Sequence, residues 1–146
     1  YGVEYIRAGL DVKAERETRD STTNPYDINR LQAIYLNRIN RDSDLRLDLT
    51  YEQIDYPFEN NTVEYLRATG QWDQRFGQEL DFNLRLEYRD EQSDLQGDST
   101  AFEQILGFRW RRRQTTVYGS FRNVFVNADV SDTTSQTVEF GIRRAF

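Results

Sequence analysis

Residues 137–146 read Thr-Val-Glu-Phe-Gly-Ile-Arg-Arg-Ala-Phe and end in an aromatic residue. Apolar and polar side chains alternate here, with Val138, Phe140 and Ile142 at every second position. Side chains of a β-strand point alternately to opposite faces of a sheet. The stretch therefore predicts a strand with one apolar face and one polar face.

The same alternation recurs upstream and predicts about eight strands in all. It is clearest in residues 80–89, where Leu80, Phe82 and Leu84 alternate with charged or amide side chains. Several of these segments run for about ten residues, which is longer than most strands of soluble proteins and long enough to cross a bilayer. The predicted strands cover about residues 6–15, 28–40, 45–52, 66–73, 80–89, 102–111, 115–128 and 137–146.

The composition is polar, but it is compatible with a membrane-spanning β-barrel. The chain has 146 residues, of which 37% are hydrophobic and 30% are charged. It contains no apolar run of the roughly 18 residues that a transmembrane helix requires. A barrel needs apolar residues only at alternate positions. We therefore predict an all-β, antiparallel, up-and-down transmembrane β-barrel that residues 1–146 form as a single domain, in a mature or trimmed chain without a signal peptide.

Two absent residue types limit the chemistry that the chain can perform. It contains no Cys and no His, which removes thiolate and imidazole ligands, disulfides and His-dependent catalytic triads. Its net charge of −6 argues against a nucleic-acid partner, because surfaces that bind phosphate backbones are basic. The sequence thus predicts a protein that is not an enzyme and has no cofactor, no metal site and no nucleic-acid partner.

The connections between the predicted strands alternate in length. Those after the first, third, fifth and seventh strands are the longer ones. The connection after the seventh strand is expected to span 129–135. In bacterial outer-membrane barrels, short turns face the periplasm and longer loops face outward. The sequence therefore predicts acidic external loops, which are either simply solvated or able to bind divalent cations. Their acidic residues are Glu17, Asp20, Glu59, Asp90, Glu91, Asp94, Asp98, Asp129 and Asp132.

Aromatic residues fall near several predicted strand ends, among them Tyr51, Trp72, Tyr88 and Trp110. Membrane barrels carry such rings as girdles at both interfaces with water. In a soluble barrel the same rings would be ordinary core residues. The pattern favours a membrane-spanning sheet without deciding the question.

The polar face of the predicted barrel carries charges of both signs. An eight-stranded barrel is filled by its inward side chains, so these charges must pair with one another. Pairs such as Asp81 with Arg85, or Glu87 with Arg89, could alternatively act as acid and base or line an ion path. The predicted lumen charge network comprises Arg7, Asp11, Lys13, Glu15, Arg46, Asp48, Glu52, Arg67, Asp73, Asp81, Arg85, Glu87, Arg89, Glu103, Arg109, Arg122, Glu139 and Arg143.

The end of the chain resembles the C-terminal insertion signal of bacterial outer-membrane β-barrels. Glu139, Gly141 and Phe146 match its polar, glycine and terminal aromatic positions, whereas Arg144 stands where an apolar residue is usual. The whole chain looks like the small eight-stranded barrels of the outer-membrane protein A and outer-membrane protein X kind. The resemblance implies the outer membrane of a Gram-negative bacterium, contact with its lipid and lipopolysaccharide, and insertion by the barrel-assembly machinery.

Three functions fit these observations. The leading hypothesis is a structural, anchoring or interaction protein with a salt-bridged lumen. A second is the C-terminal part of a larger porin or outer-membrane conduit, in which the polar face would line water. A third is a soluble, lipocalin-like ligand-binding barrel with the two faces inverted, so that Leu80, Phe82 and Leu84 point inward.

Overall fold

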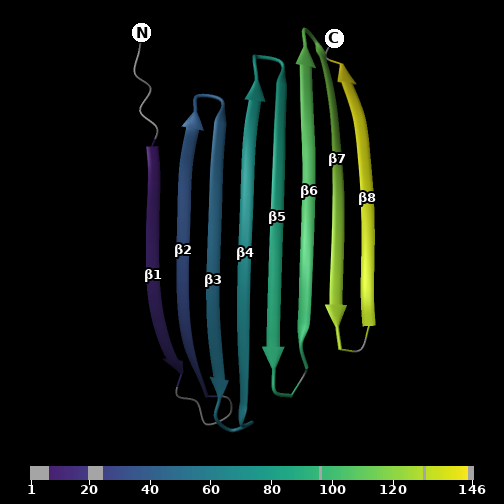
Figure 1. Ribbon diagram of the computed structural model, residues 1–146. Helices are drawn as coiled ribbons and strands as arrows, with labels where there is room; N and C mark the ends of the chain where they lie inside the picture. Colours follow the sequence, from purple (N-terminus) through teal and green to yellow (C-terminus); the bar gives the residue numbers. More distant parts are fainter. Residues whose placement is uncertain (1–6, 20–24, 96, 130, 145–146) are drawn as a thin grey trace.

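The computed structural model describes residues 7–19, 25–95, 97–129 and 131–144, and it contains one antiparallel sheet of eight strands in chain order. Each strand pairs with the next one along the chain (Figure 1). The all-β, up-and-down architecture is therefore confirmed. The strands are β1 (Arg7–Arg19), β2 (Tyr26–Asn40), β3 (Ser43–Tyr56), β4 (Asn61–Phe76), β5 (Leu80–Ser93), β6 (Ser99–Arg112), β7 (Thr115–Ala128) and β8 (Ser131–Arg144).

The sheet is open within the part of the chain that the structure describes. Its first and last strands, β1 and β8, do not pair with each other, and every strand contacts only its neighbours in sequence. The eight strands thus form a wall rather than a closed cylinder. No helix among these residues is long and apolar enough to cross a membrane.

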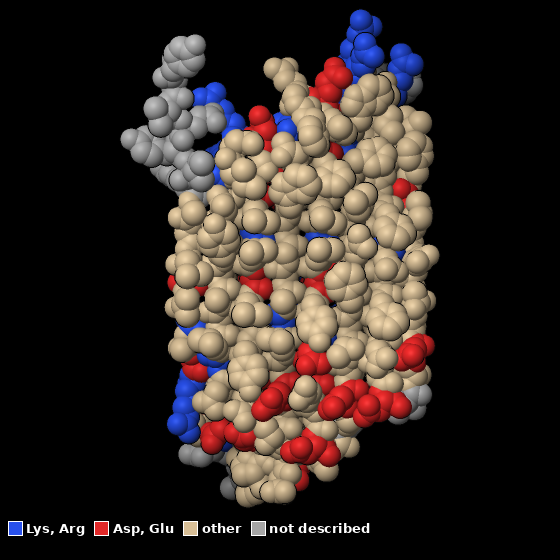
Figure 2. All heavy atoms as spheres, in the orientation of Figure 1, with Lys and Arg blue, Asp and Glu red and all other residues tan. Residues whose placement is uncertain are grey.

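One face of the wall is apolar across its middle. Strand register places Leu49 between Ala33 and Ala68 on this apolar face. On β5 the apolar side chains run from Leu80 to Tyr88, about 26 Å along the strand at 3.3 Å per residue. This length is close to the apolar band of about 25 Å on transmembrane barrels. In Figure 2 the middle of the wall is mostly uncharged, and charged residues gather at its two ends.

Aromatic side chains mark the end of this band where the short turns lie. The Trp72 indole Nε1 donates a hydrogen bond of 2.9 Å to Ser43 Oγ, and the Trp110 Nε1 donates one of 3.3 Å to Glu79 Oε2. Trp72 also meets the Phe82 ring edge-on at 5.6 Å. Each indole therefore keeps its apolar body in the band and its N–H toward polar groups, as interfacial tryptophans do.

The connections differ from the sequence-based expectation in one important respect. The predicted long link 129–135 is wrong, because β7 ends at Ala128 and β8 already begins at Ser131. Thr133 and Thr134 lie in β8. Their branched side chains favour an extended backbone, although the polar sequence there shows no alternation.

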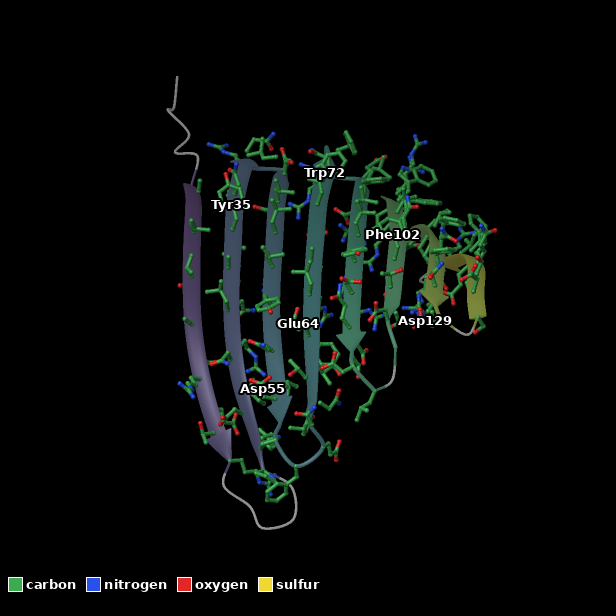
Figure 3. All side chains as sticks on the ribbon, turned by 60° about the horizontal axis from the view of Figure 1, so that its bottom comes forward. Tyr35, Asp55, Glu64, Trp72, Phe102 and Asp129 are labelled. Atoms are coloured by element: carbon green, nitrogen blue, oxygen red, sulfur yellow. The ribbon has the colours of Figure 1, made fainter. Side chains whose placement is uncertain are left out.

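Several of the predicted loop acids belong to strands instead. Asp90 and Glu91 lie in β5 and Asp132 in β8. Together with Asp55 and Glu64 they occupy the end of the wall opposite the short turns, where Figure 2 shows a band of acidic side chains. Figure 3 places Asp55 and Glu64 toward this end and Trp72 toward the other. Glu17 likewise lies in a strand, β1, whereas Glu59, Asp94, Asp98 and Asp129 lie in connections as predicted, and Asp20 lies outside the described residues. The acidity is thus shared between the strand ends and the connections.

Gly141 makes space for an aromatic ring on the polar face. A Cβ at this position would collide with the ring of Tyr118 on the neighbouring strand β7. We expect Gly141→Ala to lower the free energy of unfolding by about 1–2 kcal/mol, since the ring must move out of its place. Urea unfolding of the protein in detergent micelles measures the change. Gly9→Ala is the matched control because nothing lies within 4 Å of its Cβ, and equal effects of the two substitutions would contradict this explanation.

An amide row interrupts the apolar band on the last three strands. Gln104, Asn123 and Gln136 lie side by side on β6, β7 and β8, facing the same way as Phe121 and Phe125. The Asn123 Oδ1 is buried and accepts no hydrogen bond. We expect Asn123→Leu to raise the free energy of unfolding by roughly 1–2 kcal/mol, because it removes an unsatisfied polar atom. Asn127→Leu, near the strand end, serves as control in the same urea titration, and a loss of stability at position 123 would show that the amide has a partner.

Candidate functional site

The polar face of the wall is the candidate functional site. Strand register places the whole predicted lumen charge network on this face, because its members occupy alternate positions of paired strands. For Arg7 the structure describes the backbone position in β1. The predicted residues therefore share one face of the sheet, and the side-chain contacts show which charges meet.

Glu87, on β5, is the centre of the densest cluster. Its side chain is only 5% exposed and is contacted by three arginines: Arg67 at 3.1 Å, Arg85 at 2.8 Å and Arg89 at 3.4 Å. The three arginine side chains are 54%, 43% and 55% exposed. Three positive charges therefore share one carboxylate, and each arginine also faces solvent. The Glu87–Arg89 pair that the sequence suggested is present.

A second network joins β1, β2 and β3. Arg30 lies between two carboxylates, with its Nε 2.7 Å from Glu52 and its Nη1 3.5 Å from Glu15. Lys13 forms a further ion pair with Glu15. This network contains two cationic and two anionic groups and is balanced in charge.

Asp81 does not pair with Arg85, which was the alternative pairing considered from the sequence. It contacts Arg111 at 2.5 Å and Arg75 at 3.4 Å, on the neighbouring strands β6 and β4. Arg85 lies four residues along the same strand, about 13 Å away, and its guanidinium bridges to Glu87 instead. Contact across strands decides the partners here.

The remaining predicted charges fall into two groups. Arg122 pairs with Glu103 at 2.6 Å and Arg46 with Asp48 at 3.4 Å. The others make no ion pair among the described residues, although Asp73 accepts a hydrogen bond of 2.7 Å from Gln71. Three of them line a hollow of about 1030 Å³ near the short turns. The charges without an ion pair are Asp11, Asp73, Arg109, Glu139 and Arg143, and the last three belong to the strands β6 and β8.

Sequence reasoning missed several members of this face. Arg30, Arg75 and Arg111 are ion-pair partners that the predicted network omits, although the alternation within their strands could have identified them. It also missed an apolar row on the polar face near the acidic rim. Ile28, Ile54 and Val63 follow one another across β2, β3 and β4, and Val63 is only 7% exposed. Only the register of the three strands brings these aliphatic residues together.

The residues that resemble an insertion signal are partly described. Glu139 and Gly141 lie on the polar face of β8, whereas Phe146 lies outside the described residues. The close approach of Tyr118 gives Gly141 a structural role as well. Within the part of the chain that the structure covers, no group of three or more acidic side chains is arranged to hold a metal ion.

The fold resembles that of known outer-membrane proteins. By sequence the chain matches no protein-family model and no curated protein. In structure it resembles a loop L8 deletion mutant of OmpT, an outer membrane protein of Vibrio cholerae, with 9% identity and a TM-score of 0.67 over 94% of this chain. It also resembles in-vitro folded OmpT of the same organism in its trimer form, with 13% identity, a TM-score of 0.57 and 94% coverage. The chain spans 49% of each of those proteins. Its fold is that of an outer-membrane β-barrel wall.

The prediction that the chain is not an enzyme is wrong as it stands. It rested on the absence of His and Cys, but the fold is shared with the OmpT outer-membrane proteins, and a shared fold neither assigns nor excludes an activity. At identities of 9% and 13% the likeness shows the fold alone. Carboxylates, which are numerous on the polar face, can serve as acids and bases without imidazole. The absence of His and Cys therefore does not exclude catalysis.

Proposed function

We propose that the polar face lines a water-filled pore in the outer membrane, through which small polar solutes pass. The observation that carries this proposal is the open sheet, whose strands β1 and β8 do not pair with each other in the part of the chain described. A barrel closed by eight strands alone would be filled by side chains, whereas a barrel of about 16 strands encloses a channel. The 49% coverage of the similar structures fits a wall that forms half of such a barrel.

The exposure of the charged side chains supports the same reading. Arg67, Arg85 and Arg89 pair with one buried carboxylate while about half of each side chain faces solvent. In a plugged barrel these groups would be enclosed by the opposite wall and would need full compensation. Side chains that pair along the wall and keep one side hydrated suit the lining of an aqueous channel.

Single cysteines offer a sharp test, because the natural chain has none. Thr69 and Ala68 are neighbours on β4 that face opposite sides, Thr69 opposite Glu87 and Ala68 opposite Tyr88. The protein is inserted into a planar lipid bilayer, and a charged, membrane-impermeant thiol reagent is added to Thr69→Cys or Ala68→Cys. We expect stepwise conductance, and a change in step size on labelling at position 69 only.

Two results would overturn the pore. The first is a folded, membrane-inserted protein that conducts nothing, which would favour the structural or anchoring role with a plugged lumen. The second is conductance that responds to labelling at Ala68→Cys but not at Thr69→Cys, because water would then follow the apolar face. Heat-modifiable gel migration of each variant verifies that it has folded and inserted.

The same proposal includes the cellular setting. Lipid would cover the apolar face, lipopolysaccharide would meet the acidic rim, and the barrel-assembly machinery would act on the end of the chain that carries Glu139, Gly141 and Phe146. Fractionation of a Gram-negative host tests this, and recovery of the folded protein in the inner membrane or in soluble fractions would contradict it. Replacing Phe146 with Ala is expected to reduce the amount of protein in the outer-membrane fraction.

A further inference from the structure

The polar face contains a small hollow with an unusual lining. It measures about 290 Å³ and lies across β2 to β5, near the middle of the wall. Three arginines line it, and the other side chains are hydroxyls, amides and a single carboxylate. Hydroxyl, amide and guanidinium groups are all hydrogen-bond donors. The donors of the lining include Arg46, Arg67, Arg85, Thr50, Thr69 and Gln71.

The one carboxylate of the lining is already engaged by the wall. Asp48 accepts hydrogen bonds from Arg46 at 3.4 Å, from Gln32 at 3.3 Å and from the Thr50 hydroxyl at 3.3 Å. Its charge is therefore balanced by Arg46. Among the described residues no other acidic side chain lines the hollow.

The two other arginines retain positive charge and free donors. Arg67 and Arg85 each contact the Glu87 carboxylate through the Nη2 atom, and Arg89 contacts the same carboxylate. A guanidinium has five N–H donors, so a carboxylate with three arginine partners leaves most of these donors unused. In the three rows of β3 to β7 that include the hollow, the described side chains comprise five arginines and three carboxylates, namely Arg46, Arg67, Arg85, Arg89 and Arg122 against Asp48, Glu87 and Glu103.

We propose that this hollow binds a small tetrahedral oxyanion, either inorganic phosphate or the phosphoryl group of a solute. The binding groups are Arg67 and Arg85, with Thr69 and Gln71 beside them. Planar guanidinium groups suit phosphate because they donate two parallel hydrogen bonds. The inference deepens the proposed function and rests on it for access, since the ligand reaches the hollow through the pore. It gives a chain of net charge −6 a local preference for anions.

Binding is measured first in detergent micelles, where no pore is needed. The folded protein is titrated calorimetrically with inorganic phosphate, and glucose 6-phosphate is the second probe. We expect saturable binding, weakened about tenfold by Arg67→Gln, which removes one charge-assisted contact. Arg38→Gln is the matched control, because Arg38 is an exposed arginine of the same face that pairs with Asp44 at 3.8 Å outside the hollow. It should leave the affinity unchanged.

Each outcome decides the question. Tighter binding of inorganic phosphate would identify the free ion as the ligand, and tighter binding of glucose 6-phosphate would identify a phosphorylated solute. Absence of saturable binding to the folded wild-type protein overturns the site, even if Arg67→Gln fails to fold. An equal loss in Arg67→Gln and Arg38→Gln also overturns it. Binding in micelles without conductance in bilayers would support the oxyanion site and contradict the pore. Conductance without binding would support the pore and contradict the oxyanion site.

Discussion

Glu87→Gln is expected to lower the free energy of unfolding by about 3 kcal/mol, the lower end of the range for breaking a buried ion pair. The carboxylate is 5% exposed and is shared by Arg67, Arg85 and Arg89. Its neutralisation leaves the three guanidinium groups in mutual repulsion and without an ion-pair partner among the described residues. Water around the half-exposed arginines screens part of this repulsion, which is why the lower end of the range applies. Urea unfolding in lipid vesicles, followed by tryptophan fluorescence, measures the loss.

The matched control for this substitution is Glu139→Gln. Glu139 lies on the same polar face, in β8, and forms no ion pair with any residue that the structure describes. It should change the stability by less than about 0.5 kcal/mol, as exposed sites do. An equal loss of unfolding free energy in Glu139→Gln and Glu87→Gln would mean that the ion pairs of Glu87 with the three arginines do not stabilise the protein.

A charge on the apolar face is expected to have an effect of similar size. Leu49 is 48% exposed in the middle of the apolar band, between Ala33 and Ala68. Leu49→Arg should cost about 2–4 kcal/mol in a bilayer, the range for a cation near the midplane on the lipid side of a barrel. Thr50→Arg, one residue on and on the polar face, should cost less than about 1 kcal/mol if that face lines water as proposed.

Refolding of the wild type beside these two variants separates the membrane barrel from a soluble, lipocalin-like barrel. In the soluble alternative the apolar face would be the core, and the protein would fold without detergent or lipid. The two arginine variants are therefore refolded by dilution from urea, in buffer alone and in buffer with vesicles. Folding of the wild type in buffer alone would sink the lipid-facing assignment, whatever the two variants do.

The fold could be predicted from the sequence wherever one face is uniformly apolar. On β5 the side chains from Leu80 to Tyr88 alternate without a break, and the structure has a strand there. The alternation fails in the first half of β8, from Ser131 to Gln136, because the residues on both of its faces are polar. This is why a loop was expected where the strand begins.

The ion pairs could not be predicted residue by residue. Alternation places a charge on a face, but its partner depends on how neighbouring strands are aligned. Asp81 meets Arg75 and Arg111 only because β4 and β6 bring those residues beside it. Whether the sheet closes could not be decided from the sequence either, since β1 and β8 each have a paired neighbour and their side chains do not say whether a second one follows.

The strictly sequential pairing makes the wall modular. Each described strand contacts only the strand before it and the strand after it. A hairpin of two strands therefore contacts the rest of the sheet only through the two strands that flank it. Removal or duplication of one hairpin leaves most remaining contacts as they were, in the way that stacked repeats tolerate a change in number. Local pairing of this kind also allows folding to begin at any hairpin and to spread strand by strand. The circumference of such a barrel can therefore change in steps of two strands, without redesign of the rest.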